Sequence, residues 1–355
     1  MLVMSPINQL GYGIAGLNIV KSLAHKTDVA LFCIGQPQVT NQDDANIIQK
    51  CMNKSWLFST EDPCIKIWHQ NDMAQFAGRG KRIGFPFFEL DEFNPIEQHH
   101  LSSLDSIFVS SEWAKSIILD QIKISKDQVF VVPLAVDSNL FKPNNQTTNN
   151  NATIFLNCGK WEIRKGHDVL CEVFNQAFNN DDDVELWLLC ENPFLTQEQQ
   201  NEWINMYKKS KLGHKIRVFP RQETQQEVYN IMSNCDCGIF PSRAEGWNLE
   251  LLEIMSCGKH VIATNYSAHT EFCNKDNAYL INITDKEIAF DGKWFNGKCG
   301  KWAKISQEQK DECVYYLRQI HQLKQENKLN INQNGIETAD KLNWDTTAQK
   351  ILEYV

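Results

Sequence analysis

Short apolar segments alternate with helical patterns along the sequence, and this alternation constrains the fold more than any other feature. Strands that alternate with helices of about 8–15 residues form parallel sheets covered by helices on both faces. We expect strands at 2–7, 29–34, 65–68, 82–87, 106–110 and 128–132, and again at 153–158, 184–190, 216–219, 237–240, 260–264 and 278–281. Helical patterns cover 16–24, 112–121, 166–178, 225–233, 250–257, 307–324 and 344–354. The two series predict two doubly wound α/β domains.

A polar, Asn-rich stretch separates the two series. We expect a first domain at 1–143, a linker at 144–151, a second domain at 152–330, and a helical segment at 331–355 that packs back across the domains. A chain of 355 residues suits two domains of this size. Ligands of such sheets bind at the carboxyl ends of the strands, so we expect the site in a cleft between the domains.

Composition excludes several classes of partner. The net charge of −9 argues against nucleic acid and against a surface held to lipid by charge alone, although it leaves a peripheral membrane contact open. No apolar stretch approaches the roughly 20 residues that cross a bilayer, and no leader pattern opens the sequence. The twelve cysteines form no CxxC pair, which predicts reduced thiols rather than a zinc site. We therefore expect a cytoplasmic protein.

A glycine motif near the start favours a different class of protein. Gly11, Gly13 and Gly16 satisfy GxGxxG after a predicted strand, which is typical of NAD- or FAD-binding domains. That fingerprint also expects an acidic residue at the end of the second strand, but residues 33–36 read Cys-Ile-Gly-Gln. The redox interpretation is thereby weakened. A glycine turn at a helix start still suits a phosphate, and close helix–strand packing explains it equally.

Two carboxylates occur in the segment that holds the strongest candidates for site residues. Glu245 follows a predicted strand, and Glu253 lies inside the next predicted helix. Acidic residues at a helix start can simply complement the helix dipole. Gly246 and Asn248, however, tolerate left-handed backbone, and a loop bent in that way turns N–H groups outward as an anion cradle.

Five motifs, in order along the whole chain, resemble the retaining glycosyltransferases of family 4, which have the GT-B fold. Residues 245–253 read EGWNLELLE, where that family has EGFGL-x-x-x-E, and 254–264 look like its helix, turn and strand "AMACGTPVIAS". Residues 158–167 resemble its basic loop, written GR…KG, and 110–113 with 131–137 its "S-E…V-x-P-x-G-V-D" segments.

The resemblance implies roles in donor binding. Glu253 would accept hydrogen bonds from the donor ribose, and Glu245 would face the transferred sugar. The N–H groups of Trp247, Asn248 and Leu249, after Gly246, would meet the distal phosphate or the sugar. Lys165, with Lys160 or Arg164, would neutralise the diphosphate, and the loop around Arg221 would help to select base and sugar. This cation cluster implies a reaction without a metal or other cofactor. A solvated basic turn is the plainer interpretation of residues 164–165.

The first domain would bind the acceptor. His69 ends a predicted strand where the family often has a histidine near the transferred sugar, and Glu89 lies in a segment similar to "GY-x-x-x-E-x-D". Structural roles explain both residues equally well. Gly11, Tyr12 and Gly13 would form the glycine turn that faces the donor across the cleft.

The implied activity is transfer of a hexosyl unit from a nucleoside diphosphate sugar to a hydroxyl acceptor such as a glycan, with retention, in cell-surface glycan biosynthesis. The alternatives are a GT-B epimerase or phosphorylase and a non-catalytic sugar-nucleotide-binding protein. The sequence departs from the family at Lys160, usually Arg, at Asn248, usually Gly, and at Glu250, usually Pro. A glycine–tryptophan loop at 291–302 is extra, and either sugar stacking or buried tryptophan explains it.

Overall fold

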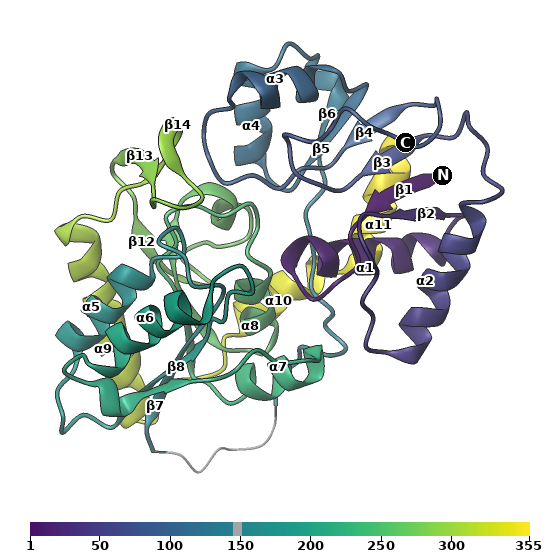
Figure 1. Cartoon of the computed structure of the whole chain (residues 1–355). Coiled ribbons are helices and arrows are strands. Elements are labelled where there is room, and N and C mark those ends of the chain that lie inside the picture. Colours follow the sequence, from purple (N-terminus) through teal and green to yellow (C-terminus); the bar gives the residue numbers. More distant parts are fainter. Residues whose placement is uncertain (145–150) are drawn as a thin grey trace. The chain divides into compact units, whose positions relative to one another are not determined.

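The computed structural model describes residues 1–144 and 151–355, which divide into two compact units. Unit 1 comprises Met1–Val136 and Lys341–Val355, and unit 2 comprises Asp137–Asp340. Most of the predicted linker lies outside the described residues. The fold is a two-domain α/β fold, with one six-stranded parallel sheet in each unit (Figure 1).

Unit 1 has the strand order β2-β1-β3-β4-β5-β6. Its strands are β1 (Leu2–Ser5), β2 (Ala30–Cys33), β3 (Cys64–Lys66), β4 (Arg82–Gly84), β5 (Ser106–Val109) and β6 (Val129–Val131). Its helices are α1 (Gly11–Ala24), α2 (Gln42–Lys54), α3 (Pro95–Ser102), α4 (Glu112–Gln121) and α11 (Trp344–Tyr354). All pairings are parallel, as the alternating pattern predicts.

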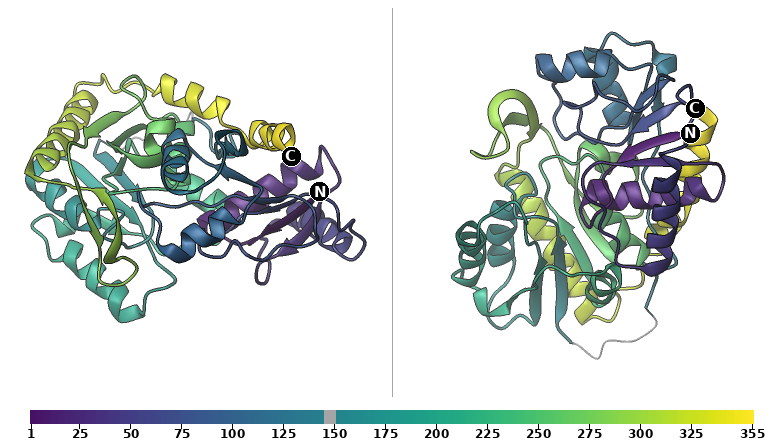
Figure 2. Two further views of the ribbon diagram at one scale, coloured as in Figure 1. Left: turned by 90° about the horizontal axis from the view of Figure 1, so that it is seen from above. Right: turned by 45° about the vertical axis from the view of Figure 1, so that its right-hand side comes forward.

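The end of the chain belongs to unit 1. Helix α11 packs beside α1, so that both termini lie close together in each view (Figures 1 and 2). Thr347 donates from Oγ1 to the Pro133 carbonyl (2.8 Å), and the Tyr354 ring stacks on Phe130. That residues 331–355 pack across both domains stays a prediction.

Unit 2 has the strand order β12-β11-β10-β7-β8-β9. Its strands are β7 (Thr153–Cys158), β8 (Val184–Leu189), β9 (Ile216–Val218), β10 (Cys237–Phe240), β11 (His260–Asn265) and β12 (Tyr279–Asn282). The helices are α5 (His167–Ala177), α6 (Gln197–Lys208), α7 (Gln225–Met232), α8 (Leu249–Ser256), α9 (Gln307–Gln325) and α10 (Gln333–Lys341). A separate antiparallel hairpin joins β13 (Lys286–Phe290) to β14 (Asn296–Ala303).

The central strands of unit 2 are buried on both faces, which explains their continuous apolar sequence. Every residue of β7 and of β10 is buried, and α5 and α9 lie side by side against the sheet (Figure 1). The loops after β7 and β10 therefore leave neighbouring strands at the same edge of the sheet.

Gly166 fixes how closely these two loops approach. It has a φ of 77°, and a Cβ added there would lie 2.1 Å from the Pro241 carbonyl oxygen. Only glycine allows this backbone and this contact.

We expect Gly166→Ala to destabilise unit 2, because left-handed strain alone costs about 1–3 kcal/mol and the clash adds to it. Thermal unfolding should show a Tm lower by about 2–4 °C per kcal/mol. Gly11→Ala is the control, because nothing lies within 4 Å of the added Cβ and the residue lies in a helix. Equal Tm values for the two variants would contradict this account.

Candidate functional site

The basic and acidic loops of unit 2 meet at Glu245, whose side chain is 4% exposed. Arg164 Nη1 lies 2.8 Å from Oε2 of this carboxylate, and Lys165 Nζ lies 3.0 Å from Oε1. Ser242 donates to Oε1 at 2.8 Å. Burial alone would raise the pKa of Glu245, but the charges of Lys165 and Arg164 outweigh it and hold the pKa well below its usual range. Glu245 is therefore ionised.

Arg164 is fully engaged within the protein. Its Nη1 also donates to the Ala244 carbonyl, and its Nη2 donates to Glu162 Oε2, each at 2.8 Å. The guanidinium thus bridges two carboxylates and a backbone carbonyl, an arrangement that needs the planar fork of arginine and that lysine cannot reproduce. In this geometry Arg164 orients the Glu245 loop.

The two lysines of the basic loop differ in exposure. Lys160 is 36% exposed by side chain and pairs with Glu162 Oε1 at 3.0 Å. Lys165 is 8% exposed by side chain and lies 3.9 Å from Glu250 Oε2 in addition to its contact with Glu245. Burial opposes the charge of Lys165, yet Glu245 and Glu250 raise its pKa above the usual value. Both lysines carry positive charge at this edge of the sheet.

Helix α8 begins directly after this ion-pair cluster. Asn248 has a φ of 85° and caps the helix, with Oδ1 accepting from the Leu251 N–H at 3.2 Å. Its Nδ2 lies 2.9 Å from His269 Nε2. Because His269 Nδ1 contacts the Thr264 carbonyl at 3.0 Å, Nδ1 carries the proton and Nε2 accepts from the amide. Asn248 thus takes a left-handed backbone position, which glycine would also allow.

Glu253 lies one turn into α8 and is 6% exposed. Burial, with smaller contributions from Glu250 and Asp137, raises the pKa of its carboxyl to about 8. Among residues 1–144 and 151–355, its side chain has no hydrogen bond or ion pair. A buried carboxyl without partners suits a ligand that brings hydrogen-bond donors.

The other predicted donor-site residues lie at the start of α8 and after β9. Gly246 is half-buried, Leu249 is the first residue of α8, and Trp247 packs its ring on Phe272 with centroids 4.8 Å apart. The indole N–H of Trp247 is buried and has no partner in the described parts of the chain. Arg221 follows β9, and its N–H donates to Glu191 Oε2 at 3.1 Å.

The predicted acceptor-side residues gather around Tyr12 in unit 1. The Tyr12 ring lies 4.7 Å from the rings of His69 and Phe87, and its hydroxyl donates to the Phe87 carbonyl at 2.9 Å. Burial raises the pKa of Tyr12, and the charge of Glu89 adds to the shift. His69 is exposed and Glu89 is half-buried.

Gly11 and Gly13 lie in the first turn of α1, which begins five residues earlier than the sequence predicts. A Cβ on Gly13 would lie 2.2–2.5 Å from Asn8 atoms, so this glycine permits a close approach of strand loop and helix. Gly11 faces open space. The structure thus brings Gly11, Tyr12, Gly13 and His69 to one end of α1.

Sequence reasoning missed the residues that hold the site in place. Glu162, Ser242, Ser267 and His269 all bind site residues, and Ser267 Oγ accepts the Glu245 N–H at 2.8 Å. No sequence pattern predicts that these four residues bind the site residues. Their partners come from loops 20 or more residues away, with the exception of Glu162 and Ser242.

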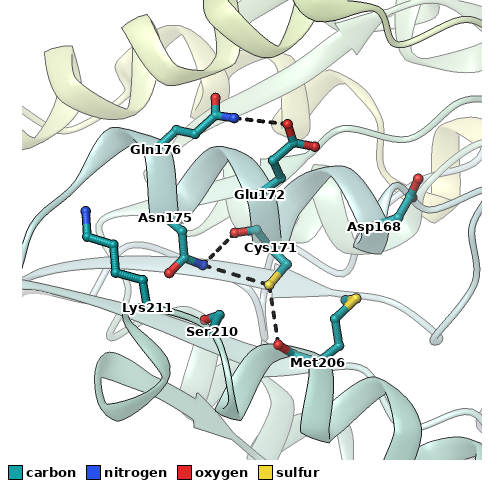
Figure 3. Close-up of a pocket in the computed structure, with 8 residues that line it drawn as sticks. All are labelled: Asp168, Cys171, Glu172, Asn175, Gln176, Met206, Ser210 and Lys211. Atoms are coloured by element: carbon teal, nitrogen blue, oxygen red, sulfur yellow. Dashed lines mark hydrogen bonds between the residues drawn. The ribbon is translucent and has the colours of Figure 1, made fainter.

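An open pocket of about 390 Å³ lies away from this cluster, between α5 and α6 (Figure 3). It is lined by Asp168, Cys171, Glu172, Asn175, Gln176, Met206, Ser210 and Lys211. None of the predicted site residues is among them. Asn175 Nδ2 donates to the Cys171 carbonyl at 2.7 Å within the wall, and the Asp168 carboxylate is bound by Arg243 at 2.8 Å. Its polar groups are thus occupied by the protein itself.

The described residues hold neither a cluster of metal ligands nor a membrane-spanning helix. In residues 1–144 and 151–355, no three or more His, Cys, Asp or Glu side chains converge in a way that could hold a metal ion. Across the same residues, no helix combines the length and apolar character needed to span a membrane.

Comparisons with known proteins agree with the chemistry of unit 2. Residues 139–290 match the family described as "Glycosyl transferases group 1". "Putative glycosyltransferase 45" of Sulfolobus islandicus filamentous virus is 21% identical over 210 residues, 58% of this chain and 55% of that protein. The phosphatidylinositol N-acetylglucosaminyltransferase GPI3 subunit of Saccharomyces cerevisiae is 22% identical over 203 residues, 53% of this chain and 44% of that protein. The chain spans about half the length of the curated relatives that it matches.

Solved structures share the fold over nearly the whole chain. Sucrose-phosphate synthase from Thermosynechococcus elongatus has a TM-score of 0.73 at 14% identity, covering 99% of this chain and 97% of that one. Anabaena HepE in complex with UDP has a TM-score of 0.70 at 14% identity, covering 99% and 98%. These solved structures show that the chain has the GT-B fold, and the family match lies within unit 2.

The raised pKa of Glu253 predicts a pH dependence of stability. A carboxyl whose pKa rises from about 4.3 when unfolded to about 8 when folded contributes stability below the unfolded value, which is lost as pH rises through the folded value. Glu253→Gln cannot ionise. We therefore expect its free energy of unfolding, relative to the original protein, to increase between pH 5 and pH 9 by a few kcal/mol, an order-of-magnitude figure.

Chemical denaturation at pH 5, 7 and 9 measures this difference. Glu326→Gln is the matched control, because its carboxyl is exposed at the surface and pairs with Lys328. If the difference in the free energy of unfolding between Glu253→Gln and the original protein stays constant over this range, folding does not raise the pKa of Glu253.

Proposed function

We propose that this chain, whose second unit carries a group 1 glycosyltransferase domain, is a retaining glycosyltransferase that needs no metal. It transfers a hexosyl unit from a nucleoside diphosphate sugar to a hydroxyl acceptor such as a glycan. The ion-pair cluster of Lys165 and Glu245 at the start of α8, with the unpaired Glu253 one turn along, carries the proposal. We also propose a cytoplasmic location and a role in cell-surface glycan synthesis.

The cations of the basic loop would bind the diphosphate. Breaking the anomeric C–O bond places negative charge on the leaving nucleoside diphosphate, and fixed positive groups stabilise that charge. Lys165 and Lys160 supply ammonium groups, and the first turn of α8 supplies backbone N–H groups and the positive end of its dipole. These groups supply the positive charge that a metal supplies in other transferases, which supports metal independence.

Glu245 would bind the transferred sugar as a carboxylate. Its pKa is lowered by Lys165 and Arg164 against the effect of burial, so it accepts hydrogen bonds and does not act as an acid. The salt bridge to Lys165 would join the sugar-binding group to the phosphate-binding group. Arg164 would act as a positioning residue for both.

Glu253 would accept hydrogen bonds from the ribose hydroxyls. A ligand that donates two hydroxyls favours the ionised carboxylate and so offsets the cost of burying its charge. Trp247, Asn248 and Leu249, with Gly246, would place their N–H groups at the distal phosphate or sugar, and Arg221 would lie toward the base.

Unit 1 would bind the acceptor through the cluster around Tyr12, with His69 and Glu89 as polar contacts and Gly11 and Gly13 forming the helix start. Retention would follow a front-face course, in which the leaving phosphate helps to take the proton of the acceptor hydroxyl. The donor base and sugar are left open; UDP is bound by the Anabaena HepE structure, and it is the first nucleotide to test.

We expect nucleoside diphosphate to stabilise the protein against heat. UDP, GDP and ADP are each added to the full chain, with NAD in a separate sample, and the matching nucleoside diphosphate at 100 times its Kd should stabilise by about 2.7 kcal/mol. Lys165→Gln and Glu253→Ala should reduce the shift. Lys328→Gln, an exposed lysine outside the site, is the control and should keep it. No shift with any of the three nucleotides contradicts the donor site, and a shift with NAD alone would favour an oxidoreductase.

A second prediction concerns the reaction. With the matching sugar nucleotide, transfer or slow hydrolysis should continue in excess EDTA, and NMR should show a first product with the anomeric configuration of the donor. Loss of turnover in EDTA that Mg²⁺ or Mn²⁺ restores would contradict metal independence, and an inverted product would contradict retention. Nucleotide binding without any transfer or hydrolysis would favour the non-catalytic alternative, whereas interconversion of two sugar nucleotides would favour an epimerase.

A further inference from the structure

The β13–β14 hairpin exposes an apolar and cationic face that the proposed reaction does not use. Lys286, Ile288 and Phe290 alternate outward along β13 and are exposed, whereas Glu287 and Ala289 point inward. Ile288 pairs directly with Lys301 of β14, and directly paired residues of an antiparallel ladder lie on the same face. With the exposed Lys298, these five residues form what we call the hairpin face.

The apolar exposure is concentrated at this hairpin. The described residues expose nine large hydrophobic side chains, and three of them, Ile288 (60%), Phe290 (61%) and Trp294 (46%), belong to it. A fourth, Phe194, contacts its tip, with ring centroids 6.0 Å from Trp294. The hairpin projects away from the sheet of its own unit in both Figure 1 and Figure 2. Such a gathering marks an interaction surface.

The charge of the segment is positive although the chain carries a net charge of −9. Residues 285–304 hold five lysines and three acidic residues, and one of these, Asp285, pairs with Lys304 at 3.6 Å. The other two carboxylates bind groups of the protein. Glu287 Oε1 lies 3.3 Å from Arg243 Nε, and Asp291 Oδ1 accepts from the N–H groups of Lys293, Trp294 and Phe295 at 2.8–2.9 Å. No carboxylate belongs to the hairpin face.

The two tryptophans of this segment have different roles. Trp302 is 1% exposed, and its Nε1 donates to Glu287 Oε1 at 3.2 Å within the hairpin, while Glu287 pairs with Arg243 outside it. The Ala303 N–H also donates to the Arg243 carbonyl at 2.9 Å. Trp294 is exposed at the tip, where Lys293 Nζ donates to Gln199 Oε1 at 2.9 Å. A rigidly anchored hairpin therefore presents an aromatic tip beside lysines.

We propose that the hairpin face docks this protein on the surface of an anionic lipid bilayer. Ile288 and Phe290 of this face, together with Trp294 at the hairpin tip, insert at the level of the lipid headgroups, where aromatic rings are favoured. Lysines beside them attract the negative surface potential of acidic phospholipids. An uncharged apolar partner would not account for the lysines, and a nucleic acid would not account for the exposed aliphatic and aromatic side chains.

Vesicle flotation tests this with the full chain. Vesicles of phosphatidylcholine alone are compared with vesicles of an equimolar mixture of phosphatidylcholine and phosphatidylglycerol. We expect flotation with the mixed vesicles only, weakening as salt screens the charges. Lys298→Ala should lower the partition coefficient about fivefold, which corresponds to about 1 kcal/mol per lysine. The double variant Ile288→Ser/Phe290→Ser should lower it about tenfold or more.

The matched control is Trp56→Ser/Leu57→Ser, which removes two side chains of unit 1 that are 85% and 92% exposed. It should keep wild-type flotation, and all variants should keep the wild-type Tm because they change exposed groups. The proposal is overturned if the wild type floats with neither vesicle, or if the control loses as much binding as the hairpin variant. It is equally overturned if the hairpin variant keeps flotation and instead lowers the sedimentation coefficient, since the face would then join two copies of the chain.

Discussion

The buried carboxylate of Glu245, held by Arg164 and Lys165, is the interaction on which the donor half of the candidate site depends. Removing one partner of a buried ion pair costs about 3–5 kcal/mol, because the remaining charge is left uncompensated. The loop after β7 and the loop after β10 are therefore fixed to each other, and Gly166 permits the approach. Helix α8 begins directly after the Glu245 loop. Glu253 and the first N–H groups of this helix therefore have fixed positions relative to the lysines.

Much of the fold could be predicted from the sequence, because the periodicity of hydrophobic residues and the alternation of strands with helices determine it. The twelve sheet strands all lie within or beside their predicted ranges. Helices α2, α3 and α6 were not predicted, since α2 and α6 bury only two residues each and α3 buries one. Their caps, Asn41, Asn94 and Thr196, were the signal available. The β13–β14 hairpin was missed because its bulge and glycines break the strand alternation.

The candidate site was predictable as a set of residues but not as a set of contacts. The motif brought Glu245, Lys165 and Glu253 to attention, and the structure gathers them at one sheet edge. The sequence does not show which of the two cations, Arg164 or Lys165, uses its hydrogen bonds within the protein. Arg164 and Lys165 are neighbours in the chain, yet the guanidinium of Arg164 already donates hydrogen bonds to Glu162, Glu245 and the Ala244 carbonyl. That distinction depends on the distances between two loops about 80 residues apart, which no local pattern encodes.

The amide–imidazole contact joins Asn248 to His269, 21 residues further along the chain. Glycine at 248 would adopt the left-handed backbone without help, whereas asparagine brings an amide that must find a buried acceptor. Loss of the imidazole would remove this acceptor, and glycine would then be the better residue at 248. The two positions should therefore change as a pair among relatives, and the order of replacement along any branch is restricted to paths on which the amide is never left buried alone.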